Sequence, residues 1–322
     1  MMRSKQVSVL AVIGAAVLLA SPAQASEPLA SCQVEVMVLG IAQDGGIPQI
    51  GNPADPAWKD PKQVRLATSL ALLDHRQSQR YLFEATPDLR AQLQRLDEYM
   101  PWTGAGLGIG GIFLTHAHIG HYAGLIFLGH ESAGASKVPV YAMPRMRAFL
   151  SENGPWDQLV RFENITLESL ANDESTPLGD ALSVTPHRVP HRDEYSETVG
   201  YSIQGPKKSL LFIPDIDSWD RWEAEFGITI EAMIAEHEVA YLDATFYNNK
   251  ELPGRDMSAF PHPRIAVSMD RFDALPERDR SKVRFIHLNH SNPARAADSV
   301  ESLQVIERGY RVAVEGERVC LS

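Results

Sequence analysis

The stretch Thr115-His116-Ala117-His118-Ile119-Gly120-His121 follows directly on the apolar run Gly111-Ile112-Phe113-Leu114. At the end of a strand, residues i and i+2 can point their imidazoles into one cavity, while residue i+5 enters from the following turn. Neutral imidazole is the commonest metal ligand in proteins. A polar turn that happens to be rich in histidine explains this spacing less well. The stretch therefore predicts a metal site at the end of a buried strand.

Three further segments place histidine or aspartate at the expected ends of strands, and they span residues 186–193, 212–217 and 285–293. In the first of them either His187 or His191 could be the ligand, and we favour His191 because His187 can stay on the preceding strand. These segments supply the more distant ligands that a metal site at the histidine stretch would need.

Two other histidines are expected to have structural roles. His287 alternates with Ile286 and Leu288, which predicts that its side chain points to the opposite face of a strand from these neighbours and packs there. His262 lies between Pro261 and Pro263, in a rigid loop that could also line the mouth of a substrate site.

Apolar, β-rich runs alternate with amphipathic segments along the chain, and this order of strands with interspersed helices occurs twice. It predicts two sheets packed face to face, with one metal site along a shared edge, in a single domain of residues 26–322. The expected helices are 87–100, 121–129 and 144–151. The expected strands are 34–39, 66–73, 81–83, 138–142, 182–185, 199–203, 210–213, 239–242 and 283–288.

The first 25 residues have the pattern of a secretory signal peptide. Arg3 and Lys5 form a basic start, residues 7–20 an apolar core, and Ala23-Gln24-Ala25 a small-residue cleavage site. An uncleaved membrane anchor is the alternative, although the apolar core is short for a membrane span. We therefore expect a periplasmic or secreted protein with no stable membrane insertion after cleavage.

The chain is acidic, with 30 Lys and Arg against 41 Asp and Glu and a formal net charge of −11. Such a charge argues against binding to nucleic acid, whose phosphates need a basic surface. A small molecule is the expected partner of a site built from histidine and carboxylate.

The two cysteines, Cys32 and Cys320, lie near the two ends of the expected mature chain. In an exported protein they could form a disulfide, and the alternative is two separate buried thiols. A zinc ribbon is excluded because two cysteines so far apart in sequence lack the paired spacing that it requires.

The histidine series resembles the metallo-β-lactamase fold superfamily, whose His-x-His-x-Asp-His signature is followed by a distant His, an Asp and a last His. Residues 189–194, 242–246 and 286–293, together with the loop 39–49, are similar to the coenzyme PQQ synthesis protein B branch of that superfamily. The resemblance implies an α/β fold, a four-layer αββα sandwich of the metallo-β-lactamase type. The implied metal ligands are His116, His118, His121, His191, Asp215 and His290.

By this resemblance, one metal would be held by His116, His118 and His191 with Asp215. A second metal would be held by His121 and His290, with Asp215 as a bridge between the two. The resemblance also places Asp215 and His290 at the catalytic centre.

The chain departs from the family pattern at two places. Gly120 stands where the signature has an aspartate, which normally binds the second metal and orients hydroxide. Asp44 or Asp193 could supply the missing oxygen ligand, although each is expected to be a loop or surface acid. The cysteines that follow the first loop in the PQQ branch are absent here, so no structural zinc is expected there.

Histidine and carboxylate ligands that leave a metal position open predict a hydrolase, because a metal at such a site makes hydroxide available at neutral pH. We expect one or two zinc ions, with iron also possible, and cleavage of an ester, lactone, amide or phosphoester. One alternative is an iron-dependent oxygenase linked to cofactor biosynthesis, which the resemblance suggests and which an export signal disfavours. Another is a non-catalytic metal-binding protein.

Overall fold

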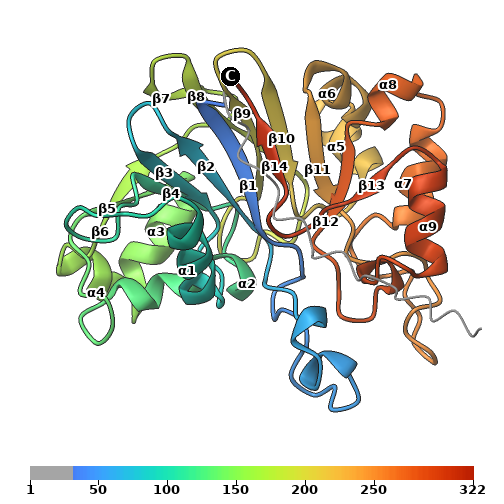
Figure 1. The fold of residues 1–322 in the computed structure, drawn as a ribbon, viewed down its shortest axis with the longest axis horizontal. Helices are drawn as coiled ribbons and strands as arrows, with labels where there is room; N and C mark the ends of the chain where they lie inside the picture. The colour runs from blue at the N-terminus through green and yellow to red at the C-terminus, as the bar shows by residue number, and fades with distance from the viewer. Residues whose placement is uncertain (1–31) are drawn as a thin grey trace, which may run out of the picture. The chain divides into compact units, whose positions relative to one another are not determined.

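The computed structural model describes residues 32–322, which form one compact unit of two seven-stranded sheets. Figure 1 shows the sheets with helices on both outer sides, α1 to α4 beside one sheet and α5 to α9 beside the other. The expected αββα sandwich is confirmed. The predicted signal peptide, residues 1–25, lies outside the described residues.

The first sheet has the strand order β14-β1-β2-β3-β4-β5-β6. The pairs β14–β1, β1–β2 and β2–β3 are antiparallel, whereas the strands from β3 to β6 run parallel to one another. Its strands are β1 (Val34–Gly40), β2 (Ser69–Asp74), β3 (Gln79–Phe83), β4 (Gly111–Phe113), β5 (Val138–Ala142), β6 (Ile165–Ser169) and β14 (Arg318–Cys320). The helices beside it are α1 (Leu89–Tyr99), α2 (Ile119–Tyr122), α3 (Pro144–Glu152) and α4 (Trp156–Arg161).

Strand β1 shows why this sheet is buried on both faces. Val34, Val36 and Val38 belong to the core cluster shared with the second sheet, whereas Met37 and Leu39 belong to the cluster under the helices. Successive side chains of a strand point to opposite faces, so the apolar run of residues 36–39 supplies both layers at once.

The second sheet has the strand order β13-β12-β11-β10-β9-β8-β7, and its strands from β10 to β13 run parallel. These strands are β7 (Thr176–Gly179), β8 (Leu182–Arg188), β9 (Val199–Gln204), β10 (Ser209–Ile213), β11 (Val239–Asp243), β12 (Val283–Ile286) and β13 (Arg311–Val312). The helices beside it are α5 (Trp219–Phe226), α6 (Ile230–Glu236), α7 (Ile265–Phe272), α8 (Glu277–Arg280) and α9 (Val300–Glu307). Short 3-10 turns cover Pro56–Trp58, Pro61–Gln63, Ala123–Leu128 and Pro293–Arg295.

The expected strands are present, but some boundaries differ. Strand β2 begins at Ser69 rather than at residue 66, and the helix expected over 121–129 is the short α2 followed by a 3-10 turn. Strand β12 ends at Ile286, two residues before the expected end. This last difference changes the metal site, because His287 is released from the alternation of the strand.

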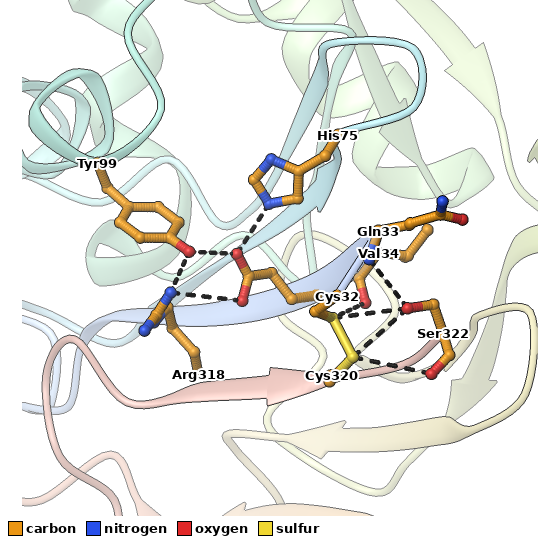
Figure 2. Close-up of a disulfide and its surroundings, with 9 residues drawn as sticks. Cys32, Gln33, Val34, His75, Tyr99, Arg318, Cys320 and Ser322 are labelled. Atoms are coloured by element: carbon orange, nitrogen blue, oxygen red, sulfur yellow. Dashed lines mark hydrogen bonds and ion pairs between the residues drawn. A yellow bond between two sulfur atoms is a disulfide. The ribbon is translucent and has the colours of Figure 1, made fainter. Parts of the chain in front are cut away.

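A disulfide joins Cys32 to Cys320 and links β1 to the neighbouring edge strand β14. Figure 2 shows this bridge with Ser322 on one side and Tyr99, His75 and Arg318 gathered nearby. The latter three side chains surround the buried carboxylate of Glu35, which accepts hydrogen bonds from Tyr99 (2.5 Å) and from His75 (2.8 Å). The structure thus selects the disulfide over two separate thiols.

Candidate metal centre

The site lies where chain segments leave several strands of both sheets. His116 and His118 follow β4, and His121 lies in α2 immediately afterwards. The segments after β8, β10 and β12 carry His191, Asp215 and His287, and the segment after β1 carries Asp44. Side chains that are far apart in sequence therefore meet at one end of the sandwich, as expected for ligands at strand ends.

One cluster, here called the first donor group, consists of His116, His118, His191 and Asp215. Each contributes one ligand atom, and these atoms lie within 4.8 Å of one another. The Asp215 Oδ2 atom is 3.3 Å from His116 Nε2 and 3.2 Å from His191 Nε2. The structure brings together all four residues predicted for the first metal.

A second donor group consists of Asp44, His121 and His287. The Asp44 Oδ1 atom lies 3.2 Å from His121 Nε2 and 3.7 Å from His287 Nε2. Asp215 connects the two groups, because its Oδ2 atom is also 3.7 Å from His121 Nε2 and it forms a further possible metal-holding group with His262 and His287. A carboxylate placed in this way can bridge two cations.

Gly120 makes room for Asp44. A Cβ atom on Gly120 would lie 2.3 Å from Asp44 Oδ1 and 2.4 Å from Asp44 Cα, far inside contact distance. An aspartate at position 120 and the observed Asp44 loop are therefore mutually exclusive. The side chain of Asp44 is 42% exposed, yet its Oδ1 atom is buried and faces the histidines. The glycine at position 120, where the signature has an aspartate, leaves the space that the Asp44 carboxylate occupies.

The structure does not bring the predicted last ligand, His290, together with the other donor residues. His290 Nδ1 lies 3.2 Å from Asn52 Nδ2, and His290 belongs to none of the three possible metal-holding groups. His287 occupies the place instead. Its φ of 68° breaks the strand alternation that predicted a side chain turned away from the site. No local pattern in the sequence shows that β12 ends at Ile286, before His287.

Positive φ angles recur at the centre. Asp44 has a φ of 27° and Glu84, whose carboxylate contacts His121, a φ of 79°. Non-glycine residues in this region are uncommon and concentrate at functional sites, where the surrounding structure holds them. At Asp44 and Glu84 the positive φ accompanies a carboxylate that contacts His121.

Side chains outside the donor groups contact four of the imidazoles, three through hydrogen bonds and one, Glu84, as a charged partner of His121. Each partner contacts Nδ1, so that Nε2 is left facing the centre. The pairs are His116 with Thr115 Oγ1 at 2.9 Å, His121 with Glu84 Oε1 at 3.3 Å, His191 with Asp217 Oδ1 at 2.9 Å, and His287 with Thr245 Oγ1 at 3.0 Å. Glu84 and Thr245 were not predicted. The sequence hint for each is its place just after a strand, β3 for Glu84 and β11 for Thr245.

His262 lies behind Asp215 and was expected to be a structural loop residue. Its Nδ1 atom is 3.1 Å from Asp215 Oδ1 and 2.9 Å from Asp243 Oδ2. Asp243 also accepts hydrogen bonds from the backbone and hydroxyl of Thr245. His262 therefore ties the bridging carboxylate to the end of β11, a contact that only the folded chain creates.

The donor atoms fit a divalent cation. Several buried atoms that face the centre have no hydrogen-bond partner within residues 32–322, which is costly for polar groups unless a cation completes them. They are His121 Nε2, His191 Nε2, His287 Nε2 and Asp44 Oδ1. Imidazole nitrogen and carboxylate oxygen are the donors that zinc prefers when sulfur is absent.

The protonation of the donor residues also fits a cation at this site. Burial lowers the pKa of His116 well below its usual value, so this imidazole is neutral and able to act as a ligand. Burial also opposes the charged form of His191 and His262, but nearby carboxylates outweigh it and raise their pKa values to about 9 and about 10. The pKa of Asp215 is held well below normal, against the effect of burial, by His191 and His262. Without a cation, the protonated imidazoles of His191 and His262 balance the negative charge of these carboxylates.

We therefore expect zinc binding to the metal-free protein to release protons and to tighten as the pH rises. The pKa of His191 is about 9, so at pH 7 a proton must leave before its nitrogen can bind a metal, and this competition ends above about pH 9. By the same linkage, the protonated imidazole stabilises the metal-free fold below about pH 6.5, and that contribution is lost as the pH rises through about 9. Calorimetry in buffers of different ionisation heat counts the protons. Affinity that is constant between pH 6 and 9 would contradict the prediction.

Two other predicted candidates lie elsewhere. Asp193 accepts a hydrogen bond from Thr198 Oγ1 (3.1 Å) and belongs to none of the possible metal-holding groups, so Asp44 is the carboxylate that the fold supplies. His187 stays on β8, where it contacts Asp173 (2.7 Å) and Ser202 (2.8 Å). The preference for His191 over His187 agrees with the geometry.

The fold and this donor set define a metallo-β-lactamase fold protein. A family model described as "Beta-lactamase superfamily domain" matches residues 79–310, so the chain belongs to this family. Within the superfamily it is similar to coenzyme PQQ synthesis protein B of Methylorubrum extorquens (strain PA1). The two are 26% identical over 306 residues, which cover 88% of this chain and 98% of that protein.

Solved structures agree on the fold. Zn²⁺-bound PqqB from Methylobacterium extorquens has a TM-score of 0.73 at 24% identity, covering 88% of this chain and 99% of that one. A diphosphatase from the PhnP family has a TM-score of 0.62 at 20% identity, covering 89% of this chain and 96% of that one. The chain is thus a PqqB-like member of the metallo-β-lactamase superfamily.

Proposed function

We propose that this protein is an exported, zinc-dependent hydrolase whose two donor groups hold two ions side by side. Its substrate contains an ester, lactone, amide or phosphoester bond. The observation that carries the proposal is the carboxylate of Asp215, which lies within reach of both donor groups. Asp44 supports it by giving the second group the carboxylate that Gly120 cannot provide.

When bound, zinc lowers the pKa of a coordinated water to about 7 and so supplies hydroxide at neutral pH. The residues of this chain do the positioning. Glu84, Asp217 and Thr245 hold the imidazole rings so that Nε2 faces the centre. His262 holds the outer oxygen of Asp215. Such outer partners fix the geometry that a reactive site needs.

The proposal is tested by metal analysis and turnover of the purified protein. We expect two zinc ions per chain and hydrolysis of 4-nitrophenyl esters or of bis(4-nitrophenyl) phosphate that a chelator abolishes and zinc restores. His116→Ala should remove both the ion of the first donor group and the activity, whereas His130→Ala, on the surface, should change neither. Turnover that survives chelation and His116→Ala would overturn the proposal.

A second candidate function comes from the relatives named coenzyme PQQ synthesis protein B, of which this chain covers 98% in the first comparison. It is an iron-dependent oxidation linked to cofactor synthesis, since imidazole and carboxylate ligands also suit iron. One iron per chain, with no hydrolysis of any ester, would favour it over the hydrolase.

Export is part of the proposal. The signal pattern of residues 1–25 supports it, and so does the Cys32–Cys320 disulfide, because disulfides persist in oxidising compartments. No helix within residues 32–322 is long and apolar enough to cross a bilayer. Fractionation of expressing cells, with the mass of the recovered protein, is expected to find a processed chain outside the cytoplasm. A full-length cytoplasmic protein would contradict export.

A further inference from the structure

Two cavities meet at His262, the residue that holds Asp215. The smaller one, here called the Arg192 cavity, measures about 370 Å³ and is lined by Arg192, Arg255, Phe246, Phe260 and His290 among others. The larger one, here called the Asp217 cavity, measures about 730 Å³. Both cavities are lined by His262, which contacts Asp215 of the metal centre. The charge of the other lining residues therefore decides which ligands each cavity can bind.

The wall of the Arg192 cavity carries two positively charged side chains. None of its lining residues in the described part of the chain is Asp or Glu. The Arg192 side chain forms no hydrogen bond or ion pair with residues 32–322, and the Arg255 guanidinium lies 5.1 Å above the Phe260 ring without a carboxylate partner there. Glu194 attracts Arg192 from outside this cavity wall. In a chain of net charge −11, two arginines in a wall that contains no Asp or Glu still form a local attraction for anions.

The Asp217 cavity has the opposite character. Its walls include Asp217, Asp220 and Asp270 together with two arginines, Arg264 and Arg271. Arg264 already donates hydrogen bonds to Asn249 Oδ1 (2.7 Å) and to the carbonyl of His262 (2.5 Å). Arg271 lies 2.6 Å from Asp220 and 2.5 Å from Glu231. A guanidinium that already has two carboxylate partners has little left to offer an incoming anion. An acidic ligand is therefore steered to the Arg192 cavity.

Part of the wall of the Arg192 cavity is apolar and aromatic. The rings of Phe246 and Phe260 lie 5.9 Å apart, and Phe246 stands edge-on to His262 at 6.0 Å. Apolar rings and guanidinium groups in the wall of one cavity suit a molecule that has an apolar body and a charged end.

From this arrangement, and resting on the proposed hydrolase function, we infer that the substrate carries an anionic group separate from the bond that is cleaved. Arg192 and Arg255 bind this group, a carboxylate or a phosphate, while Phe246 and Phe260 contact the apolar part of the molecule. Arg192 directly follows the ligand His191 in the chain, so the anion is held beside the metal centre. Guanidinium is the side chain best matched to both kinds of anion.

The test compares two esters that share a leaving group, 4-nitrophenyl hexanoate and the hemiester 4-nitrophenyl adipate. The zinc-loaded protein is expected to have the higher kcat/KM for the hemiester. Arg192→Gln and Arg255→Gln should each lower the hemiester-to-hexanoate ratio of kcat/KM by about tenfold, through KM, because a lost hydrogen bond to a charged group is worth that much. Arg90→Gln is the control, since Arg90 lies over Phe127 at 5.4 Å in a cavity without metal-site residues. Equal ratios in the parent protein and in both variants would overturn the inference.

A binding measurement separates this inference from the hydrolase proposal. Calorimetry with adipate and the zinc-loaded protein should show a Kd at least about tenfold weaker in the Arg192→Gln/Arg255→Gln double variant, at unchanged zinc content. Arg-dependent adipate binding without turnover of either ester would contradict the hydrolase and leave the anion site standing. Turnover of both esters with identical adipate binding in parent and double variant would do the reverse.

Discussion

His287→Ala is expected to remove the ion of the second donor group and to lower hydrolysis by about 100-fold or more. The expectation follows from geometry: His287 Nε2 faces Asp44 Oδ1 at 3.7 Å, and its Nδ1 atom is held by Thr245. Replacing even an outer partner of a metal ligand costs about 10–100-fold in metal affinity or activity, so loss of a ligand should cost at least as much. Metal content by mass spectrometry and kcat/KM for the best ester measure both effects.

His290→Ala is the matched comparison, because His290 lies three residues farther along the same segment. It contacts Asn52 and lines the Arg192 cavity without belonging to either donor group. The variant should retain two ions, with any change limited to KM. If His290→Ala lost an ion and His287→Ala kept both, the ligand predicted from the family signature would be right and the structure wrong at this point.

Gly120→Ala is expected to have the second large effect, although it adds one methyl group. The new Cβ atom would lie 2.4 Å from Asp44 Cα, so the backbone of the Asp44 loop, and not merely a side chain, must move. We expect the first donor group to keep its ion, the second to lose its ion, and hydrolysis to fall by about 10–100-fold, as for other losses of metal support.

Gly45→Ala is a suitable control for this variant. It adds the same methyl group within the same loop, where the nearest atom would be Gln49 Cγ at an ordinary 3.6 Å. Two ions in Gly120→Ala would show that Asp44 is no ligand.

Much of the architecture is readable from local pattern. The apolar run of residues 36–39 in β1, with Val36 and Met37 on opposite faces, predicts a strand buried on both sides. Three histidines after β4 predict a metal site there, and the αββα arrangement follows from the repeated order of strands and helices together with the family resemblance. These features depend on residues close in sequence, whose periodicity survives without knowledge of distant contacts.

The remaining parts of the site were decided by tertiary structure. Whether the cysteines pair depends on β1 and β14 becoming neighbours. Whether His287 or His290 faces the centre depends on a single positive φ after β12. Whether Asp44 replaces the missing aspartate depends on the space that Gly120 leaves for it. Gly120 lies more than 70 residues farther along the chain. Local sequence determined which elements form and which side chains are available as ligands. The packing of loops from both sheets determined which of them meet, because a ligand set is a matter of distance in space and the sequence records only distance along the chain.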